Sequence, residues 1–277
     1  MKKTRRVLTI LMLIVAIICT TIFTPWLALW AWIAPLPGSV QQQVDDALAL
    51  GLDGIIVYVD QKGRPPIFYC AGWKNKQNKV PADPQALFKI ASISKLYLAT
   101  ATAKLVGNRR LSLEDTLGDL LPELAARIEN ANKITLRMLL QHRSGIPDWI
   151  EDPSFPWEEP LRDVNKVLEL VVDDPSAFEP DSRYSYSNTN YLLVGSILDK
   201  TLGYAHQQYI RSEILAPLGL KHTFSLLSEV DTSAVASGYD SHYEQDVKRL
   251  DFVSPSGSMV ATAQDVGIFL RALNQGS

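Results

Sequence analysis

Two strand-like runs stand near the start of this chain, and almost everything after them has the apolar spacing of helices. The runs read LDGIIVYVD and RPPIFYCAGW, and the turn-like QKGR between them predicts a hairpin. Strands followed by helices predict an α+β fold. Because two strands make a poor sheet, we expect partner strands to be missing. Helical patterns precede and follow the hairpin, over residues 40–50, 95–106, 135–141, 163–172, 191–202, 206–215 and 263–273.

The N-terminus has the pattern of a membrane anchor or a signal peptide. Four basic residues precede residues 7–24, which carry no charge and, as a helix, come close to the thickness of a bilayer core. Pro25 ends this pattern. We expect residues 1–38 to be the anchor or signal segment with its linker, in contact with the membrane. Residues 39–277 then form a domain outside the cytoplasm, periplasmic or at the cell surface. An uncleaved anchor and a cleaved signal both stay open.

Composition and charge exclude several classes of protein. Of the 277 residues, 47% are apolar and 21% are charged, which is typical of a globular chain and not of a disordered one. The net charge is −3, and without the four basic residues ahead of Val7 it is −7, so we expect no nucleic acid partner. The four histidines share no ligand spacing and no nucleotide-binding glycine motif occurs, so we expect no metal and no cofactor.

One serine has a lysine at a spacing that suits nucleophilic catalysis. Ser92 precedes Lys95 by three residues, where the apolar helical pattern KLYLATATAKLV begins. Residues three apart on a helix share a face, so the amine can reach the hydroxyl and accept its proton. The free N–H groups of a helix N-terminus also favour an alkoxide. A match of this kind arises by chance in a chain of this size, and an N-cap serine beside an exposed lysine is the structural alternative.

A second motif lies in YSYSNTNYLLVG, which follows the turn-forming EPDSR and precedes a helical pattern. It contains Tyr186 and Asn188. A phenol near a lysine can relay a proton, and an asparagine can hold both the lysine and a substrate carbonyl. The structural alternative is a buried tyrosine and an N-cap asparagine. Taken singly each motif favours its structural interpretation, and the presence of both strengthens the catalytic one.

With these motifs the chain resembles the serine β-lactamase and penicillin-binding superfamily, in particular class C β-lactamases and D-alanyl-D-alanine carboxypeptidases. The resemblance covers residues 52–277 in unbroken order. It implies the β-lactamase fold, an antiparallel sheet with helices on both faces plus a helical subdomain. HRSG and YSYSNTN favour the carboxypeptidase branch. The other matching segments are RLSLEDTLGDLLPEL, ITLRMLLQHRSGIPDW, ILAPLGLKHT and SPSGSMVATAQDVGIFLRAL.

The resemblance also implies roles for individual residues. Ser92 is the expected nucleophile, Lys95 its activating base, Tyr186 a second proton-transfer group, and Asn188 a positioner of substrate and lysine. The implied reaction is acylation of the serine by an amide or ester, followed by hydrolysis of the acyl-enzyme. The backbone N–H of the serine is one implied oxyanion donor. Gly145, in HRSG, matches a turn of the family, and we interpret it as structural.

The sequence departs from the family in its third motif. Lys-Thr-Gly or His-x-Gly on a strand is expected after the helix ending near Leu273, and neither occurs up to Ser277. In the family this strand forms one wall of the cleft and donates the second oxyanion N–H. The strands after it complete the sheet, so we expect the C-terminal strands to be missing from this chain. Loss of one oxyanion donor costs about 10²–10³ in turnover, so the activity of the chain as printed stays open.

Three hypotheses follow. The first is a D-alanyl-D-alanine carboxypeptidase-like serine hydrolase acting on cell-wall peptides, with a small molecule or peptide as its substrate. The second is a β-lactamase or esterase on the same scaffold, since a fold does not determine a substrate. The third is a non-catalytic, membrane-anchored module that binds peptidoglycan. The loop PDWIEDPSFPWEEP borders the cleft or packs on the surface, and both interpretations stay open.

Overall fold

The computed structural model describes residues 2–35, 38–157, 161–239, 246–251 and 254–276. The chain divides into two compact units, Met1–Gln43 and Val44–Ser277. The first unit contains α1 (Lys2–Phe23), α2 (Trp26–Ile33) and the first turn of α3 (Val40–Ala49), and the rest of α3 belongs to the second unit. α1 and α2 are interrupted at Pro25, which has no backbone N–H to continue a helix. The linker expected before residue 39 includes residues 36–37, which lie outside the described residues.

The structure does not support the predicted membrane anchor. In the part of the chain that is described, no helix combines the length and the apolar character needed to cross a bilayer. The membrane contact expected through the N-terminal helix is not supported either.

The predicted hairpin forms the first sheet. β1 (Gly54–Val59) pairs antiparallel with β2 (Ile67–Asn75), in a register that places Gly54 opposite Gly72. A short third strand, β3 (Val80–Pro81), lies beside β2 and gives the order β1-β2-β3. β-Branched and aromatic side chains make up most of β1 and recur along β2, and such residues favour an extended backbone.

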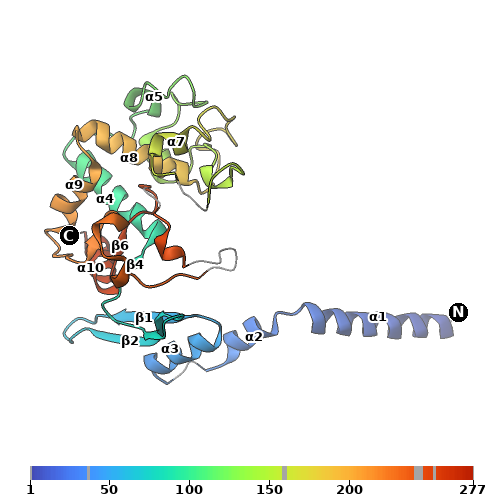
Figure 1. The fold of residues 1–277 in the computed structure, drawn as a ribbon. Helices are drawn as coiled ribbons and strands as arrows, with labels where there is room; N and C mark the ends of the chain where they lie inside the picture. Colours follow the sequence, from blue (N-terminus) through green and yellow to red (C-terminus); the bar gives the residue numbers. More distant parts are fainter. Residues whose placement is uncertain (1, 36–37, 158–160, 240–245, 252–253, 277) are drawn as a thin grey trace. The chain divides into compact units, whose positions relative to one another are not determined.

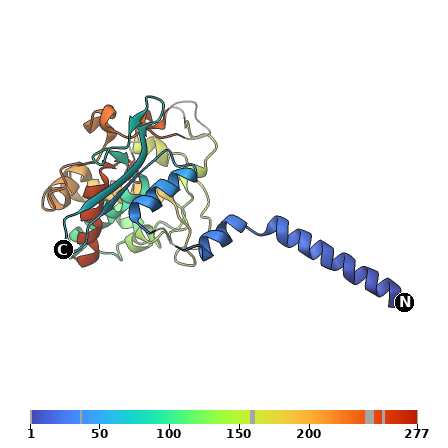
Figure 2. The same ribbon diagram turned by 90° about the horizontal axis from the view of Figure 1, so that it is seen from below.

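Helices lie on both faces of this hairpin (Figures 1 and 2). On one face is α3 (Val40–Ala49), where the side chain of Leu48 lies 2.9 Å from the position that a Cβ at Gly72 would occupy. On the other is α10 (Ala263–Gln275), where Gly267 lets the ring of Tyr58 approach the helix backbone. This is the arrangement that the resemblance implies, an antiparallel sheet between helices.

A second small sheet brings distant segments together next to Ser92. It consists of β4 (Phe88–Lys89), β6 (Val260–Ala261) and β5 (Thr223–Phe224), in the order β4-β6-β5. Its strands were not predicted from the sequence, because two residues are too few for an alternating pattern to be recognised. Since β4 ends three residues before Ser92, its pairing with β6 holds residues 254–259 close to the site.

The helical subdomain surrounds two buried helices, α4 (Ser94–Gly107) and α8 (Asn188–Leu202). Figure 1 shows α5, α7 and α8 on the side of α4 remote from β1 and β2. The ring of Tyr97 on α4 stacks on Phe269 of α10, with centroids 3.8 Å apart, which joins the subdomain to the sheet. Each predicted helical pattern contains a helix, although several are shorter than predicted. The remaining α-helices are α5 (Leu117–Leu120), α6 (Leu136–Leu140), α7 (Val164–Leu168) and α9 (His206–Ile210), and α9 continues into the π-helical Arg211–Leu215. Short 3-10 helices lie at Leu227–Glu229, Thr232–Ala234 and Val247–Arg249.

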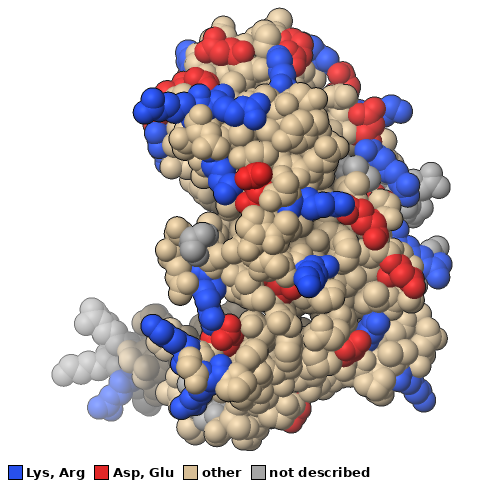
Figure 3. Space-filling model, turned by 90° about the vertical axis from the view of Figure 1, so that its left-hand side faces the viewer, with Lys and Arg blue, Asp and Glu red and all other residues tan. Residues whose placement is uncertain are grey.

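Charged side chains of both signs are mixed on the surface. On the face in Figure 3, Lys and Arg lie among Asp and Glu without a continuous patch of one sign. Ion pairs account for part of this mixing. Arg127, for example, contacts Glu169 at 2.8 Å and Asp173 at 2.6 Å. Exposed pairs of this kind contribute little to stability, about 0–1 kcal/mol each.

Candidate active site

Ser92 lies in a 3-10 turn, Ala91–Ile93, that continues directly into α4. The chain enters this turn through Ala91, whose φ of 44° is in the left-handed region that L residues rarely adopt. Lys95 follows on the first turn of α4 and is only 5% exposed. Its Nζ lies 3.2 Å from the Oγ of Ser92, so the spacing of three places the amine beside the hydroxyl. The alternative of an exposed lysine is wrong.

Lys95 has three acceptors around its amine. Besides Ser92, Nζ donates to Oδ1 of Asn188 and to the backbone oxygen of Ser256, both at 2.8 Å. The three bonds use all the protons of an ammonium group. The two oxygens of Asn188 and Ser256 can only accept, so a neutral amine keeps both bonds and turns its lone pair to the serine. This arrangement suits a base that takes the proton of Ser92.

Burial makes this lysine a weaker base than an exposed one. It lowers the pKa of Lys95 from 10.5 to about 8, because the charged form loses its hydration, while the carboxylate of Asp148 acts in the opposite direction. An amine with this pKa is partly neutral near physiological pH. The neutral amine, which accepts a proton, and the protonated amine, which holds it, are therefore both accessible.

Tyr186 comes from the segment just before α8 and reaches the same serine. Its hydroxyl lies 2.8 Å from the Oγ of Ser92, where either oxygen can donate. Its ring lies over the amine of Lys95, with Nζ 5.0 Å from the ring centroid. The side chain is 41% exposed, so the alternative of a buried structural tyrosine is wrong. The phenol is in position to exchange a proton with the serine.

Asn188 is the first residue of α8, and its side chain faces the site. Ser187 is the N-cap, so the alternative that Asn188 is a capping residue is wrong. The amide joins two charged groups: Oδ1 accepts from Lys95, and Nδ2 donates to Asp148 at 2.9 Å. The structure thus brings together all four residues that the sequence singled out, Ser92, Lys95, Tyr186 and Asn188.

Sequence reasoning missed three groups in contact with these residues. One is the backbone oxygen of Ser256, which no residue-type pattern can reveal. The others are His142, whose ring stacks on Tyr186, and Asp148. His142 begins the segment HRSG, whose turn the sequence analysis interprets as structural, and Asp148 stands in the loop PDWIEDPSFPWEEP, for which a position at the cleft stays open there. The family match of these segments could have indicated both residues, because polar side chains that are buried need hydrogen-bond partners.

The turn at residues 143–145 is indeed packed inside the protein. Ser144 is 1% exposed and donates to Oδ1 of Asn190 at 2.6 Å. Gly145 has a φ of 82°, and its oxygen accepts the N–H of Ala177 at 2.9 Å. The loop after this turn serves two purposes. Asp148 reaches the site, while Trp149 packs into the core at 5% exposure. Its last residues, 158–160, lie outside the described ones.

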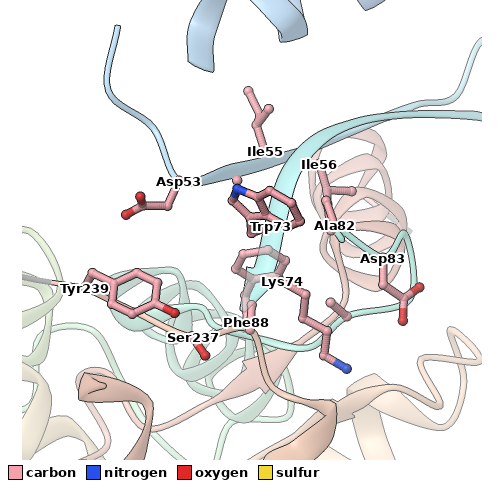
Figure 4. Close-up of a pocket in the computed structure, with 13 residues that line it drawn as sticks. Asp53, Ile55, Ile56, Trp73, Lys74, Ala82, Asp83, Phe88, Ser237 and Tyr239 are labelled. Carbon is pink, nitrogen blue, oxygen red and sulfur yellow. The ribbon is translucent and has the colours of Figure 1, made fainter. Parts of the chain in front are cut away.

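The described residues also line a cavity of about 100 Å³ between β2 and the segment around residue 237 (Figure 4). None of the four candidate site residues lines it. Two of its polar groups have partners: Asp53 pairs with Lys76 at 2.6 Å, and the hydroxyl of Tyr239 accepts the backbone N–H of Lys76 at 3.0 Å. No group of three or more metal-ligating side chains occurs in the described part of the chain.

Comparison with known proteins places this geometry in a family. The β-lactamase family model matches residues 40–277. The chain is 32% identical over 189 residues to a protein named beta-lactamase from Pseudomonas fluorescens, covering 68% of this chain and 50% of that one. It is 28% identical over 211 residues to Protein flp of Staphylococcus aureus strain MW2, covering 74% of this chain and 42% of that one. The chain thus spans about half the length of these relatives.

Among solved structures, the D-amino acid amidase from Ochrobactrum anthropi SV3, complexed with D-phenylalanine, superimposes with a TM-score of 0.77 at 29% identity. The match covers 85% of this chain and 70% of the amidase. The family model matches most of the chain, and a solved structure superimposes on most of it. Both findings agree with the resemblance found in the sequence. The chain belongs to the beta-lactamase family of serine hydrolases.

Proposed function

We propose that the protein is a serine hydrolase that is acylated at Ser92 and cleaves D-alanyl peptides of the cell wall, in the manner of a D-alanyl-D-alanine carboxypeptidase. One observation supports this above all: the Oγ of Ser92 contacts both the Tyr186 hydroxyl, at 2.8 Å, and the Lys95 amine, at 3.2 Å. A serine held by two groups that exchange protons is an activated nucleophile.

In the proposed reaction, Oγ of Ser92 attacks the carbonyl carbon of the scissile amide as neutral Lys95 takes its proton. The backbone N–H of the serine stabilises the oxyanion that forms. Tyr186 delivers a proton to the departing amine, so that the C–N bond breaks and an ester to Ser92 remains. A water molecule then attacks this ester, with the same two groups returning its proton to the serine oxygen. The acid is released and the enzyme is restored.

The proposed substrate is an amide next to a D-residue. The relative from Ochrobactrum anthropi is named a D-amino acid amidase, and it is 29% identical to this chain over a fold of the same kind. A second candidate is a β-lactamase, since the relative from Pseudomonas fluorescens carries that name at 32% identity. Both reactions begin with the same acylation of Ser92. They differ in which acyl-enzyme is hydrolysed quickly by water.

Labelling with a fluorescent penicillin, followed by peptide mapping, tests the acylation. We expect the label on Ser92, its loss in Ser92→Ala, and its retention in Ser112→Ala, a control on a serine outside the site. Label retained in Ser92→Ala, or mapped to Ser144 or Ser258, contradicts the proposal. A protein that folds but takes no label indicates a binding module. Release of D-alanine from a D-alanyl-D-alanine peptide then separates carboxypeptidase from β-lactamase activity.

We also propose that the domain works outside the cytoplasm, where such peptides occur. The basic residues followed by the uncharged residues 7–24 support export by a signal segment. N-terminal sequencing of the protein recovered from the source cells tests this. A mature chain that starts near residue 39 agrees with export, and an intact N-terminus on a chain found in the cytoplasm contradicts it.

A further inference from the structure

Asp148 is a nearly buried carboxylate one layer behind the catalytic residues. It is 9% exposed and precedes the short 3-10 helix Trp149–Glu151. One carboxylate oxygen accepts the backbone N–H of Ile150 at 3.3 Å. The other accepts from Nδ2 of Asn188 at 2.9 Å. Both oxygens therefore have a donor, and the second donor belongs to a residue that contacts Lys95.

This contact determines which way the amide of Asn188 faces. A side-chain amide has one oxygen and one NH₂ group on opposite sides. Because the carboxylate of Asp148 can only accept, it selects the NH₂ group and leaves the oxygen toward Lys95, 2.8 Å from Nζ. If the amide turned over, its NH₂ group would face the NH₃⁺ of the lysine and its oxygen would face the carboxylate. Both contacts would then be repulsive.

The loop that carries Asp148 is fixed to the start of α8. The hydroxyl of Thr189 accepts the N–H of Trp149 at 3.1 Å and donates to the oxygen of Pro147 at 2.7 Å. The hydroxyl of Ser187 donates to the same oxygen at 3.2 Å. The residues on either side of the carboxylate are thus bonded to the residues on either side of the asparagine. This makes the distance between the two side chains insensitive to motion of the loop.

Asp148 is also the acidic group whose charge acts on Lys95. The other titratable groups facing the lysine are His142 and the two phenols Tyr186 and Tyr191. Burial and the positive charge of Lys95 both lower the pKa of His142, which favours a neutral ring. Among these neighbours Asp148 is the acidic group, and its negative charge stabilises the protonated lysine against the effect of burial.

We propose that Asp148 is a positioning residue: its carboxylate holds the amide of Asn188 with the oxygen toward Lys95, and its negative charge stabilises the protonated form of that lysine. The catalytic part of this inference rests on the proposed function, because the protonation state of Lys95 affects catalysis only if Lys95 is the base of that reaction. The geometry itself does not depend on the substrate.

The test measures the titration of Lys95 directly, in the full chain labelled with [ε-¹³C]lysine, with the signal assigned by Lys95→Arg. In Asp148→Asn, which keeps the size of the side chain and removes the charge, we expect the lysine to bind its proton about tenfold more weakly, so that its titration moves to lower pH. The matched control is Asp152→Asn, in the same loop, where the carboxylate bonds to Ser154. We expect no change there. An unchanged titration in folded Asp148→Asn overturns the proposal.

A measurement on the unaltered protein covers the case in which Asp148→Asn does not fold. In the unaltered protein, the side-chain amide proton of Asn188 that is directed at the Asp148 carboxylate should exchange with solvent more slowly than the amide protons of an exposed asparagine. Exchange as fast as that of an exposed asparagine overturns the proposal. Because neither measurement needs turnover, the outcome is separate from that of penicillin labelling. A protein that takes no label but whose lysine responds to Asp148→Asn refutes the hydrolase and keeps this inference.

Discussion

The ring of His142 stacks on the ring of Tyr186, with centroids 4.4 Å apart and planes inclined by 30°. Nδ1 of the same imidazole accepts the backbone N–H of Ser187 at 3.2 Å, directly after the tyrosine. The histidine therefore holds both the ring and the backbone of the segment that brings the phenol to Ser92. Burial lowers the pKa of His142, and a neutral ring can accept this hydrogen bond.

His142→Ala is expected to slow acylation of Ser92 at least tenfold, because the phenol loses the surface that sets its position and a misplaced catalytic group loses most of its effect. The measurement is the rate of labelling by a fluorescent penicillin. His222→Ala is the control, since His222 is exposed and lies outside the site. Equal rates in the two variants contradict this role. A thermal melt of each variant shows whether the loss comes from unfolding.

The rate of acylation is expected to rise with pH up to about 8. The neutral form of Lys95 accepts the proton, and burial lowers its pKa to about 8. Below that pH the neutral fraction falls about tenfold for each pH unit, so labelling at pH 7 should be about ten times faster than at pH 6, and the rate should level off above pH 8. Rates measured from pH 6 to 9 check this. A profile that is flat across this range contradicts a lysine base.

Lys95→Ala and Tyr186→Phe are expected to slow acylation strongly but not additively. Both groups contact the same Oγ, and each exchanges a proton with it in one transition state. Each single variant should lose about 10²-fold or more in rate, and the double variant little more than the worse single one. The labelling rates of the unaltered protein, the two single variants and the double variant form a double-mutant cycle. A double variant that loses the full product of the two factors shows that the groups act independently.

The long elements and part of the candidate site were predictable from the sequence for a physical reason. β1 and β2 are runs rich in β-branched and aromatic residues that are long enough to be recognised, and α4 and α8 repeat apolar residues over several turns. Ser92 and Lys95 are three apart where a 3-10 turn continues into α4, so local geometry alone joins them. Tyr186 and Asn188 lie some 90 positions further on, and only the resemblance indicated that they would meet the serine.

What the sequence could not reveal depends on contacts between distant segments. β4 and β6 have two residues each, and they exist as strands because they pair across more than 160 positions. The carbonyl of Ser256 reaches Lys95 through that pairing. The orientation of Asn188 likewise depends on Asp148, forty positions before it. In each case the information lies in a tertiary hydrogen bond and not in a local periodicity.

Gly145→Ala is expected to destabilise the protein more than Gly203→Ala, although both glycines have a left-handed backbone, with φ of 82° and 78°. At either position an L residue costs about 1–2 kcal/mol in backbone strain. Gly203 ends α8, and nothing lies within 4 Å of the position of an added Cβ, so strain is its whole cost. At Gly145 the Cβ would lie 2.2 Å from the backbone oxygen of Phe178, which cannot move without breaking the packed turn. Thermal unfolding of both variants checks this, and equal losses of stability would show that the turn adapts. Because the same turn leads into Asp148, Gly145→Ala should also slow acylation of Ser92, whereas Gly203→Ala should not.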